Sequence, residues 1–132
     1  MATIRARCSN QPTLLVVDDD PEVRMLLCEL FAQKGFHVEV AEDGAAAIQF
    51  LEQHEPPSAI LLDLVMPGIT GTGVLSYLGS TTSLLNIPVA IVSGTPDLAP
   101  PGYRVFKKPF RFAPLLEFVR TACDASSLTD AA

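Results

Sequence analysis

The sequence is short of three features, each of which would mark a class of protein. Its three cysteines are odd in number and far apart, which indicates neither a disulfide framework nor a zinc site. No apolar run approaches the length of a membrane span, and the first dozen residues lack the apolar stretch of a secretory signal. Basic residues are few, and the net charge is -6. We therefore expect a cytoplasmic protein that binds no membrane and no nucleic acid directly, because nucleic-acid binding needs many Lys and Arg.

What is present fits one compact domain. The chain has 132 residues, of which 48% are hydrophobic and 18% are charged, as in ordinary globular domains. We expect the folded domain to span residues 13–123. Residues 1–12 are expected to form a flexible N-terminal tail, and residues 124–132 a C-terminal tail or linker.

Short apolar runs alternate with helical patterns along the chain. Strands are predicted at residues 14–17, 59–62 and 89–92, with weaker signals at 37–40 and 104–106. Apolar residues at helical spacing predict helices at 21–34, 45–53, 73–78 and 114–123. This alternation predicts an α/β fold, a doubly wound parallel sheet with helices on both faces.

Polar residues follow four of these strands. Asp18 and Asp19 come after the first, Asp63 after the third, Ser93 after the fourth and Lys108 after the fifth. The carboxyl ends of parallel strands line one crevice, so these side chains should meet there. Carboxylates from two strands suit Mg²⁺. Beside a divalent cation and an ammonium group, a carboxylate can attack a phosphoryl group, which predicts phosphoryl-transfer chemistry.

Other interpretations of the acidic stretch are weaker. An apolar strand ending in two aspartates also occurs in Mg²⁺-dependent nucleotidases, but the sequence contains no G-x-x-x-x-G-K-[ST] loop. An aspartyl-phosphatase of another fold would need a second carboxylate two residues after its nucleophile, where Val65 stands. Asp20 is expected to cap the first helix, because Pro21 follows it at a position typical of a helix start.

Four motifs occur together in a familiar order. They are the acidic pair after the first strand, "DLVMPG" after the third, "SG" after the fourth and "KPF" after the fifth. In this order the sequence resembles the receiver domain of two-component response regulators over about residues 13–123. The resemblance implies a five-stranded sheet in the flavodoxin-like order 2-1-3-4-5.

The resemblance also implies a role for each site residue. Asp63 matches the phospho-acceptor, Ser93 the switch hydroxyl and Lys108 the lysine that pairs with the phosphoryl group. Asp18, Asp19, Asp63 and the backbone carbonyl of Val65 match the Mg²⁺ ligands. A histidine kinase or histidine phosphotransfer protein would supply the phosphoryl group, and the chain would at most catalyse its own phosphorylation and dephosphorylation. The alternative is an interaction module that keeps the fold without switching by phosphorylation.

Two departures from the family concern the segment between Ser93 and Lys108. It holds three prolines and two glycines and is too short for a normal helix, so the fourth helix should be missing or rudimentary. Val105 stands where the family usually has its switch aromatic. Loss of the fourth helix should expose apolar sheet surface unless Leu98 and Tyr103 cover it, and no charged residue occurs from residue 64 to 96. Because exposed apolar surface is often an interface, we expect a partner or a second copy to bind across the third helix and the 94–103 loop.

Overall fold

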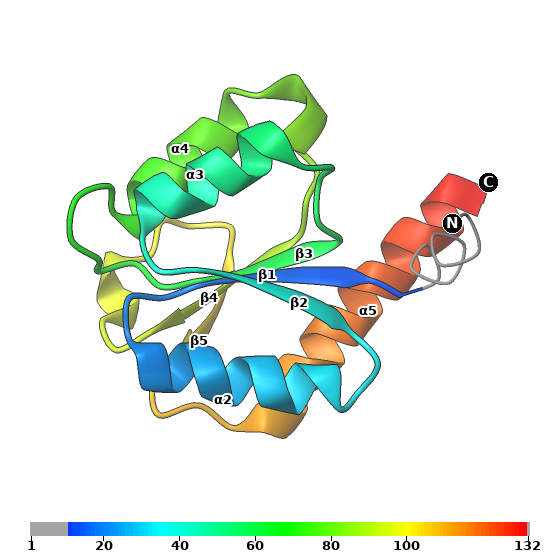
Figure 1. Ribbon diagram of the computed structural model, residues 1–132, viewed down its shortest axis with the longest axis horizontal. Coiled ribbons are helices and arrows are strands. Elements are labelled where there is room, and N and C mark those ends of the chain that lie inside the picture. Colours follow the sequence, from blue (N-terminus) through cyan, green and yellow to red (C-terminus); the bar gives the residue numbers. More distant parts are fainter. Residues whose placement is uncertain (1–10, 132) are drawn as a thin grey trace.

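The computed structural model describes residues 11–131, and Figure 1 shows a five-stranded sheet between two layers of helices. All strand pairs are parallel, and their order is β2-β1-β3-β4-β5. The strands are β1 (Thr13–Val17), β2 (His37–Ala41), β3 (Ala59–Leu62), β4 (Val89–Ser93) and β5 (Arg104–Lys107). The predicted fold class and strand order are confirmed. Most of the predicted N-terminal tail, residues 1–10, lies outside the described residues.

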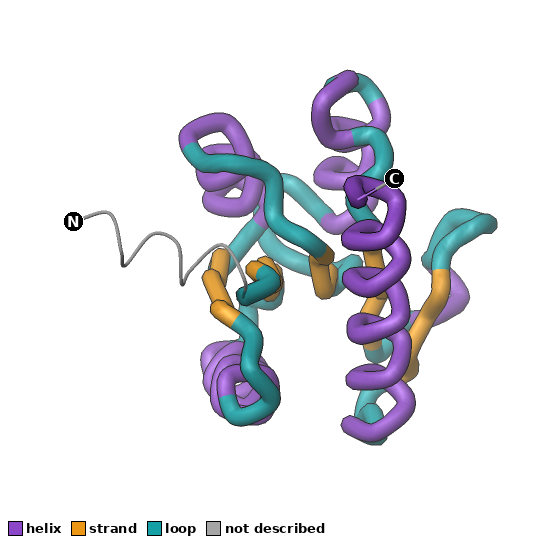
Figure 2. The backbone as a smooth tube through the Cα atoms, turned by 90° about the vertical axis from the view of Figure 1, so that its right-hand side faces the viewer, coloured by secondary structure: helices purple, strands orange, loops and turns teal. Residues whose placement is uncertain are grey.

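Four α-helices complete the two outer layers. They are α2 (Pro21–Ala32), α3 (Gly44–Gln53), α4 (Gly71–Gly79) and α5 (Phe112–Ala131). Helices α3 and α4 cover one face of the sheet, and α2 and α5 cover the other (Figures 1 and 2). Helix α5 continues through Ala131, beyond the predicted helix end at residue 123. The assignment of residues 124–132 to a tail or linker outside the domain stays a prediction. None of the described helices is both long enough and apolar enough to cross a membrane.

The apolar residues form one core on each face of the sheet. Alternate strand residues contribute to the two cores, so that Leu15 and Ile91 face α3 and α4 while Leu14 and Val92 face α2 and α5. All four of these side chains are buried. The central strands β1, β3 and β4 are therefore apolar on both faces, which explains their continuous apolar sequences. This rigid centre positions the loops at the carboxyl ends of the strands.

Local signals set the helix starts near those carboxyl ends. The Asp20 carboxylate accepts a hydrogen bond of 2.9 Å from the Glu22 amide, which confirms the predicted cap of α2. Asp43 caps α3 by accepting from the Ala46 amide at 2.8 Å. Helices α2 and α3 therefore begin shortly beyond the ends of β1 and β2.

The segment between β4 and β5 contains no full α-helix, as predicted. Its only helical element is the 3-10 turn η2 (Pro96–Leu98), so the fourth helix is reduced to one turn. Leu98 and Tyr103 remain 59% and 39% exposed, so they do not cover the sheet. Ala99 and Val105 pack only partly against the core. A second 3-10 turn, η1 (Thr82–Leu84), follows α4.

Candidate functional site

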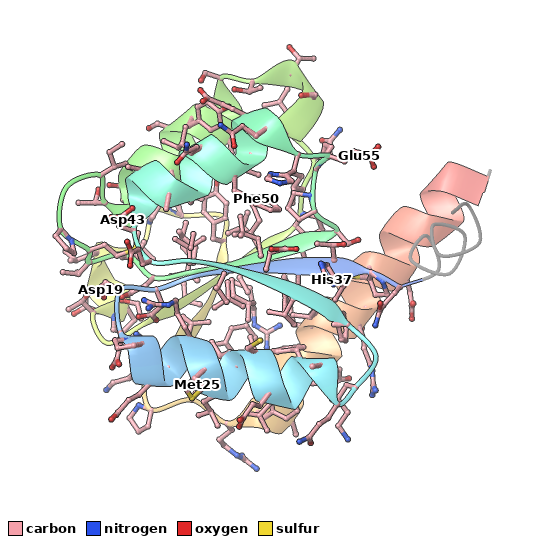
Figure 3. The ribbon with its side chains drawn as sticks, in the orientation of Figure 1. Asp19, Met25, His37, Asp43, Phe50 and Glu55 are labelled. Carbon is pink, nitrogen blue, oxygen red and sulfur yellow. The ribbon has the colours of Figure 1, made fainter. Side chains whose placement is uncertain are left out.

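The carboxyl ends of the central strands bring the predicted site residues together. Backbone hydrogen bonds hold them: the Asp63 amide donates to the Val17 carbonyl at 2.9 Å, and the Lys108 amide donates to the Ser93 carbonyl at 2.9 Å. These bonds join the end of β1 to that of β3 and the end of β4 to that of β5, and β3 pairs with β4 between them. Figure 3 shows Asp19 and Asp43 at this same end of the molecule.

Three carboxylates converge at this edge. Asp18, Asp19 and Asp63 each place a carboxylate oxygen within 4.8 Å of the others. Asp18 and Asp63 are only 2% and 6% exposed, whereas Asp19 is exposed to solvent. Three hard oxygen donors at this separation form a set that fits a divalent cation such as Mg²⁺, with the exposed side left for water ligands.

Lys108 supplies a positive charge to the same site. Its Nζ donates a hydrogen bond to Asp18 Oδ2 at 2.7 Å and lies 3.6 Å from Asp63 Oδ2. The second oxygen of Asp18 accepts from the Asp20 amide at 2.9 Å. Both oxygens of this buried carboxylate are therefore partnered, and its lysine is held beside Asp63.

The electrostatics of the site favour a further cation. Burial, followed by the charge of Asp18, raises the pKa of Asp63, although Lys108 and the backbone amides of Leu64 and Val65 act in the opposite direction. Burial by itself lowers the pKa of Lys108, but the hydrogen bond and charge of Asp18, together with Asp63, outweigh it and raise that pKa. Lys108 therefore stays charged while the pocket keeps an excess of carboxylates.

Ser93 lies fully buried at the end of β4, but its hydroxyl group is already engaged. Ser93 Oγ accepts a hydrogen bond of 2.9 Å from the Thr95 amide and lies 3.1 Å from Thr95 Oγ1. Within residues 11–124, both of its hydrogen-bond partners belong to Thr95. Either hydroxyl of this pair can be the donor, so the Ser93 hydroxyl can bond to a group on Asp63 only when its proton points away from Thr95.

Two residues that shape the site were missed by sequence reasoning. Arg24 Nη1 donates to the Asp18 carbonyl at 2.7 Å, which ties helix α2 to the pocket. Gly71 is packed against the backbone of Asp63, where a Cβ would overlap the Asp63 carbonyl oxygen and Leu64. Neither position carries a signal in the sequence, because both act through backbone contacts across the fold. The expected part of the Val65 carbonyl as a metal ligand stays a prediction.

The family-model comparison matches residues 14–119 to the response regulator receiver domain. The chain belongs to this family. Phosphorylation-dependent signalling is the general function of receiver domains. Protein Rrf1 of Nitratidesulfovibrio vulgaris is 30% identical to this chain over 112 residues, which cover 83% of this chain and 80% of Rrf1.

Other receiver relatives are longer proteins. The sensor histidine kinase TmoS of Ectopseudomonas mendocina is 30% identical over 67% of this chain, and the putative response regulator NtrX-like of Rickettsia felis is 29% identical over 90% of it. The chain spans 9% of the kinase and 26% of the regulator. This family thus includes receivers that are small parts of larger proteins.

Solved receiver structures share the fold. The signal receiver domain of a putative Luxo repressor protein from Vibrio parahaemolyticus has a TM-score of 0.80 and 26% identity, covering 92% of this chain and 96% of that one. TrrA from Thermotoga maritima, solved in complex with Mg²⁺-BeF, has a TM-score of 0.74 and 25% identity, covering 85% and 99%. The arrangement of strands and helices is therefore that of a receiver domain.

Proposed function

We propose that the chain is a phospho-accepting receiver in which Asp63 takes a phosphoryl group from a histidine kinase or a histidine phosphotransfer protein. The observation that carries this proposal is the meeting of three carboxylates within 4.8 Å beside the Lys108 ammonium group. A structural role alone does not require three carboxylates at one strand edge, because each adds repulsion to the others. A Mg²⁺-dependent phosphoryl-transfer site accounts for them, because carboxylates hold the cation and one of them accepts the phosphoryl group.

Each residue of the site has a separate part in this chemistry. A carboxylate oxygen of Asp63 attacks phosphorus, the new P–O bond forms and the P–N bond to the donor imidazole breaks. Lys108 neutralises charge on the phosphoryl oxygens, and the Ser93 hydroxyl donates to one of them when its proton points away from Thr95. Mg²⁺, held by Asp18, Asp19, Asp63 and the Val65 carbonyl, would supply further neutralisation of charge.

The consequence of phosphorylation in this proposal is a change in protein contacts. The phosphoryl group carries about -1.5 to -2 charge units next to the Asp18–Lys108 pair, and because the Asp63 carboxylate loses its own charge when the P–O bond forms, the net gain is about -0.5 to -1. The new charge competes with Asp18 for Lys108 and with Thr95 for the Ser93 hydroxyl. Rearrangement of the 94–103 loop would then alter the surface beside α4. A cytoplasmic location, expected from the separated cysteines, belongs to the same proposal.

The decisive experiment is incubation with acetyl phosphate, with and without Mg²⁺, followed by intact mass measurement. We expect one phosphoryl group on the wild type with Mg²⁺ and none on Asp63→Asn. Asp97→Asn is the matched control, because Asp97 is an exposed carboxylate in the 94–103 loop. It should be phosphorylated like the wild type. Modification that survives in Asp63→Asn would contradict the assignment of the acceptor.

The second candidate function is an interaction module that does not switch by phosphorylation. One observation favours it: β5 places no aromatic side chain on the face of the sheet that α3 and α4 cover. Val105 lies on that face, while Phe106 packs into the core on the opposite face. The usual inward movement of an aromatic ring therefore has no counterpart in β5. An unmodified wild-type protein after incubation with acetyl phosphate and Mg²⁺ would support this second function.

A further inference from the structure

The outer edge of β5 ends the sheet on the side opposite β2. No other described strand pairs with this edge. On one face the layer formed by α3 and α4 stops short of β5, and only the loop with η2 lies near it (Figure 2). On the other face a groove of about 300 Å³ separates the edge from α5 and is lined by Arg104, Pro114, Glu117, Phe118 and Thr121. Arg104 and Lys107 of this edge are exposed, and Val105 is half-buried.

The backbone of β5 leaves hydrogen-bonding groups on this edge. The Lys108 amide donates to the Ser93 carbonyl of β4. Because successive residues of a strand point their backbone groups to opposite sides, Phe106 also faces β4, while Val105 and Lys107 face outward. An added strand would find two N–H and two C=O groups there, which is the basis of β-strand addition.

The side chains along this edge are basic in an otherwise acidic chain. Five of the nine Lys and Arg residues lie between residues 104 and 120, where Glu117 is the single acidic residue. Arg104 and Lys107 are both exposed, and neither forms an ion pair within residues 11–124. The Arg104 guanidinium lies 4.9 Å from the ring centroid of Phe106 and 5.8 Å from that of Phe118. This stacking holds the arginine in place for a carboxylate.

Apolar side chains adjoin the same edge on the face that lacks a helix. Leu98 and Tyr103 are exposed, and Val105 is half-buried beside them. These three residues, together with Arg104 and Lys107, form what we call the β5 edge surface. A strand laid along it would meet apolar groups on the open face of the sheet and the arginine on the α5 face.

We propose that the β5 edge surface binds an extended acidic segment of a partner protein, which adds to the sheet as a sixth strand next to β5. The acidic character follows from the two unpaired basic side chains, and the extended form follows from the outward backbone groups of Val105 and Lys107. A second β5 edge is disfavoured as occupant because its Arg and Lys would face like charges, the usual protection against edge-to-edge pairing. The proposal is independent of phosphorylation.

The test uses a blocked seven-residue peptide of alternating glutamate and valine, with amide chemical shifts and affinity as readouts. We expect binding that perturbs the amides of Val105 and Lys107 and weakens as salt rises. The Lys107→Glu variant should bind about tenfold more weakly, and Arg104→Gln/Lys107→Glu more weakly still. Lys34→Glu is the matched control, because Lys34 is exposed beyond the end of α2. It should bind like the wild type.

Further probes separate the other occupants. A peptide of the same sequence with alternate backbone amides methylated should lose binding, since it keeps the charge but cannot extend the sheet. Equal binding of that peptide, equal weakening by Lys34→Glu, or no binding of the acidic peptide would overturn the proposal. So would tighter binding of a ten-residue oligothymidylate than of the peptide. Concentration-dependent self-association that Lys107→Glu abolishes, seen by sedimentation, would instead identify a second copy as the occupant.

Discussion

The acidic pocket and the β4–β5 segment lie at the same end of the sheet but differ in how far they follow the receiver pattern. In the pocket, Asp18, Asp19, Asp63 and Lys108 come together as the family motifs predict. In the β4–β5 segment a helix is reduced to the turn η2, and Val105 stands in place of an aromatic residue. The carboxylates and the lysine of the receiver pattern are therefore retained, while the β4–β5 segment departs from that pattern. Phosphorylation of the pocket and partner binding by the β4–β5 segment can therefore be tested separately.

The largest effect should come from breaking the pocket at Lys108. In Lys108→Met the buried Asp18 carboxylate loses its 2.7 Å partner and stays beside Asp63. We expect the free energy of unfolding to fall by about 3 kcal/mol, as when one member of a buried ion pair is removed. Urea unfolding at neutral pH without Mg²⁺ measures it.

The neighbouring lysine provides the control for that experiment. Lys107 is exposed and points away from the pocket, so Lys107→Met should stay within about 0.5 kcal/mol of the wild type. Equal losses in the two variants would mean that the Lys108 contacts to Asp18 and Asp63 do not stabilise the fold.

The second prediction concerns the backbone support of Asp63. Because a Cβ at Gly71 would overlap the Asp63 carbonyl oxygen and the Leu64 backbone, Gly71→Ala must displace the loop that carries the acceptor. We expect a loss of about 2 kcal/mol in unfolding free energy, typical of overpacking, and slower phosphorylation by acetyl phosphate. Both are measured on the same preparation.

Gly79→Ala in the same helix is the matched substitution. A Cβ at Gly79 meets no atom within 4 Å, so this variant should keep both the stability and the phosphorylation rate of the wild type. A Gly71→Ala protein that behaves like Gly79→Ala would show that the close packing against Asp63 does not position the acceptor.

The sequence alone predicted those elements whose start or end is determined by neighbouring residues. Asp20 and Pro21 mark the start of α2 through a cap that involves only neighbouring residues, and the three prolines after Ser93 exclude a full helix whatever the rest of the chain does. The convergence of the carboxylates also followed, because parallel strands place their carboxyl ends at one edge.

What could not be predicted depends on contacts between distant segments. The Arg24 bond to the Asp18 carbonyl and the packing of Gly71 on Asp63 exist only once helices and strands are docked. The engagement of Ser93 by Thr95 depends on the backbone course of the loop, which the sequence pattern does not specify. The extension of α5 through Ala131 was missed because residues 124–131 show no helical apolar spacing in the sequence.

A third, smaller effect is the pH dependence that Asp63 gives to the metal-free protein. Burial and Asp18 raise the pKa of this carboxyl in the folded state above its unfolded value. The stability that protonated Asp63 gives the folded protein is therefore fully present at a pH below the pKa of this carboxyl in the unfolded chain. It is lost as the pH rises through the higher pKa of the folded protein. Asp63→Asn should lack this loss, so that at neutral pH in EDTA it melts at a higher temperature than the wild type.

Two comparisons check that pH effect. Adding Mg²⁺ should raise the melting temperature of the wild type more than that of Asp63→Asn, because one of the three carboxylates is missing from the variant. Asp97→Asn, which removes an exposed carboxylate, should follow the wild-type profile. Parallel melting profiles for wild type and Asp63→Asn between acidic and neutral pH would contradict the raised pKa.

The smallest effect on stability should come from the β4–β5 segment. Leu98 is 59% exposed in the 94–103 loop, so Leu98→Ser should change the free energy of unfolding by no more than about 0.5 kcal/mol. Its phosphorylation by acetyl phosphate should equal that of the wild type, since Leu98 makes no contribution to the carboxylate group or to the Lys108 pair. Urea unfolding and intact mass measurement check the two expectations. A changed phosphorylation rate without a change in stability would mean that the pocket and the β4–β5 segment are coupled even before a phosphoryl group arrives, because the substitution touches only the second of them.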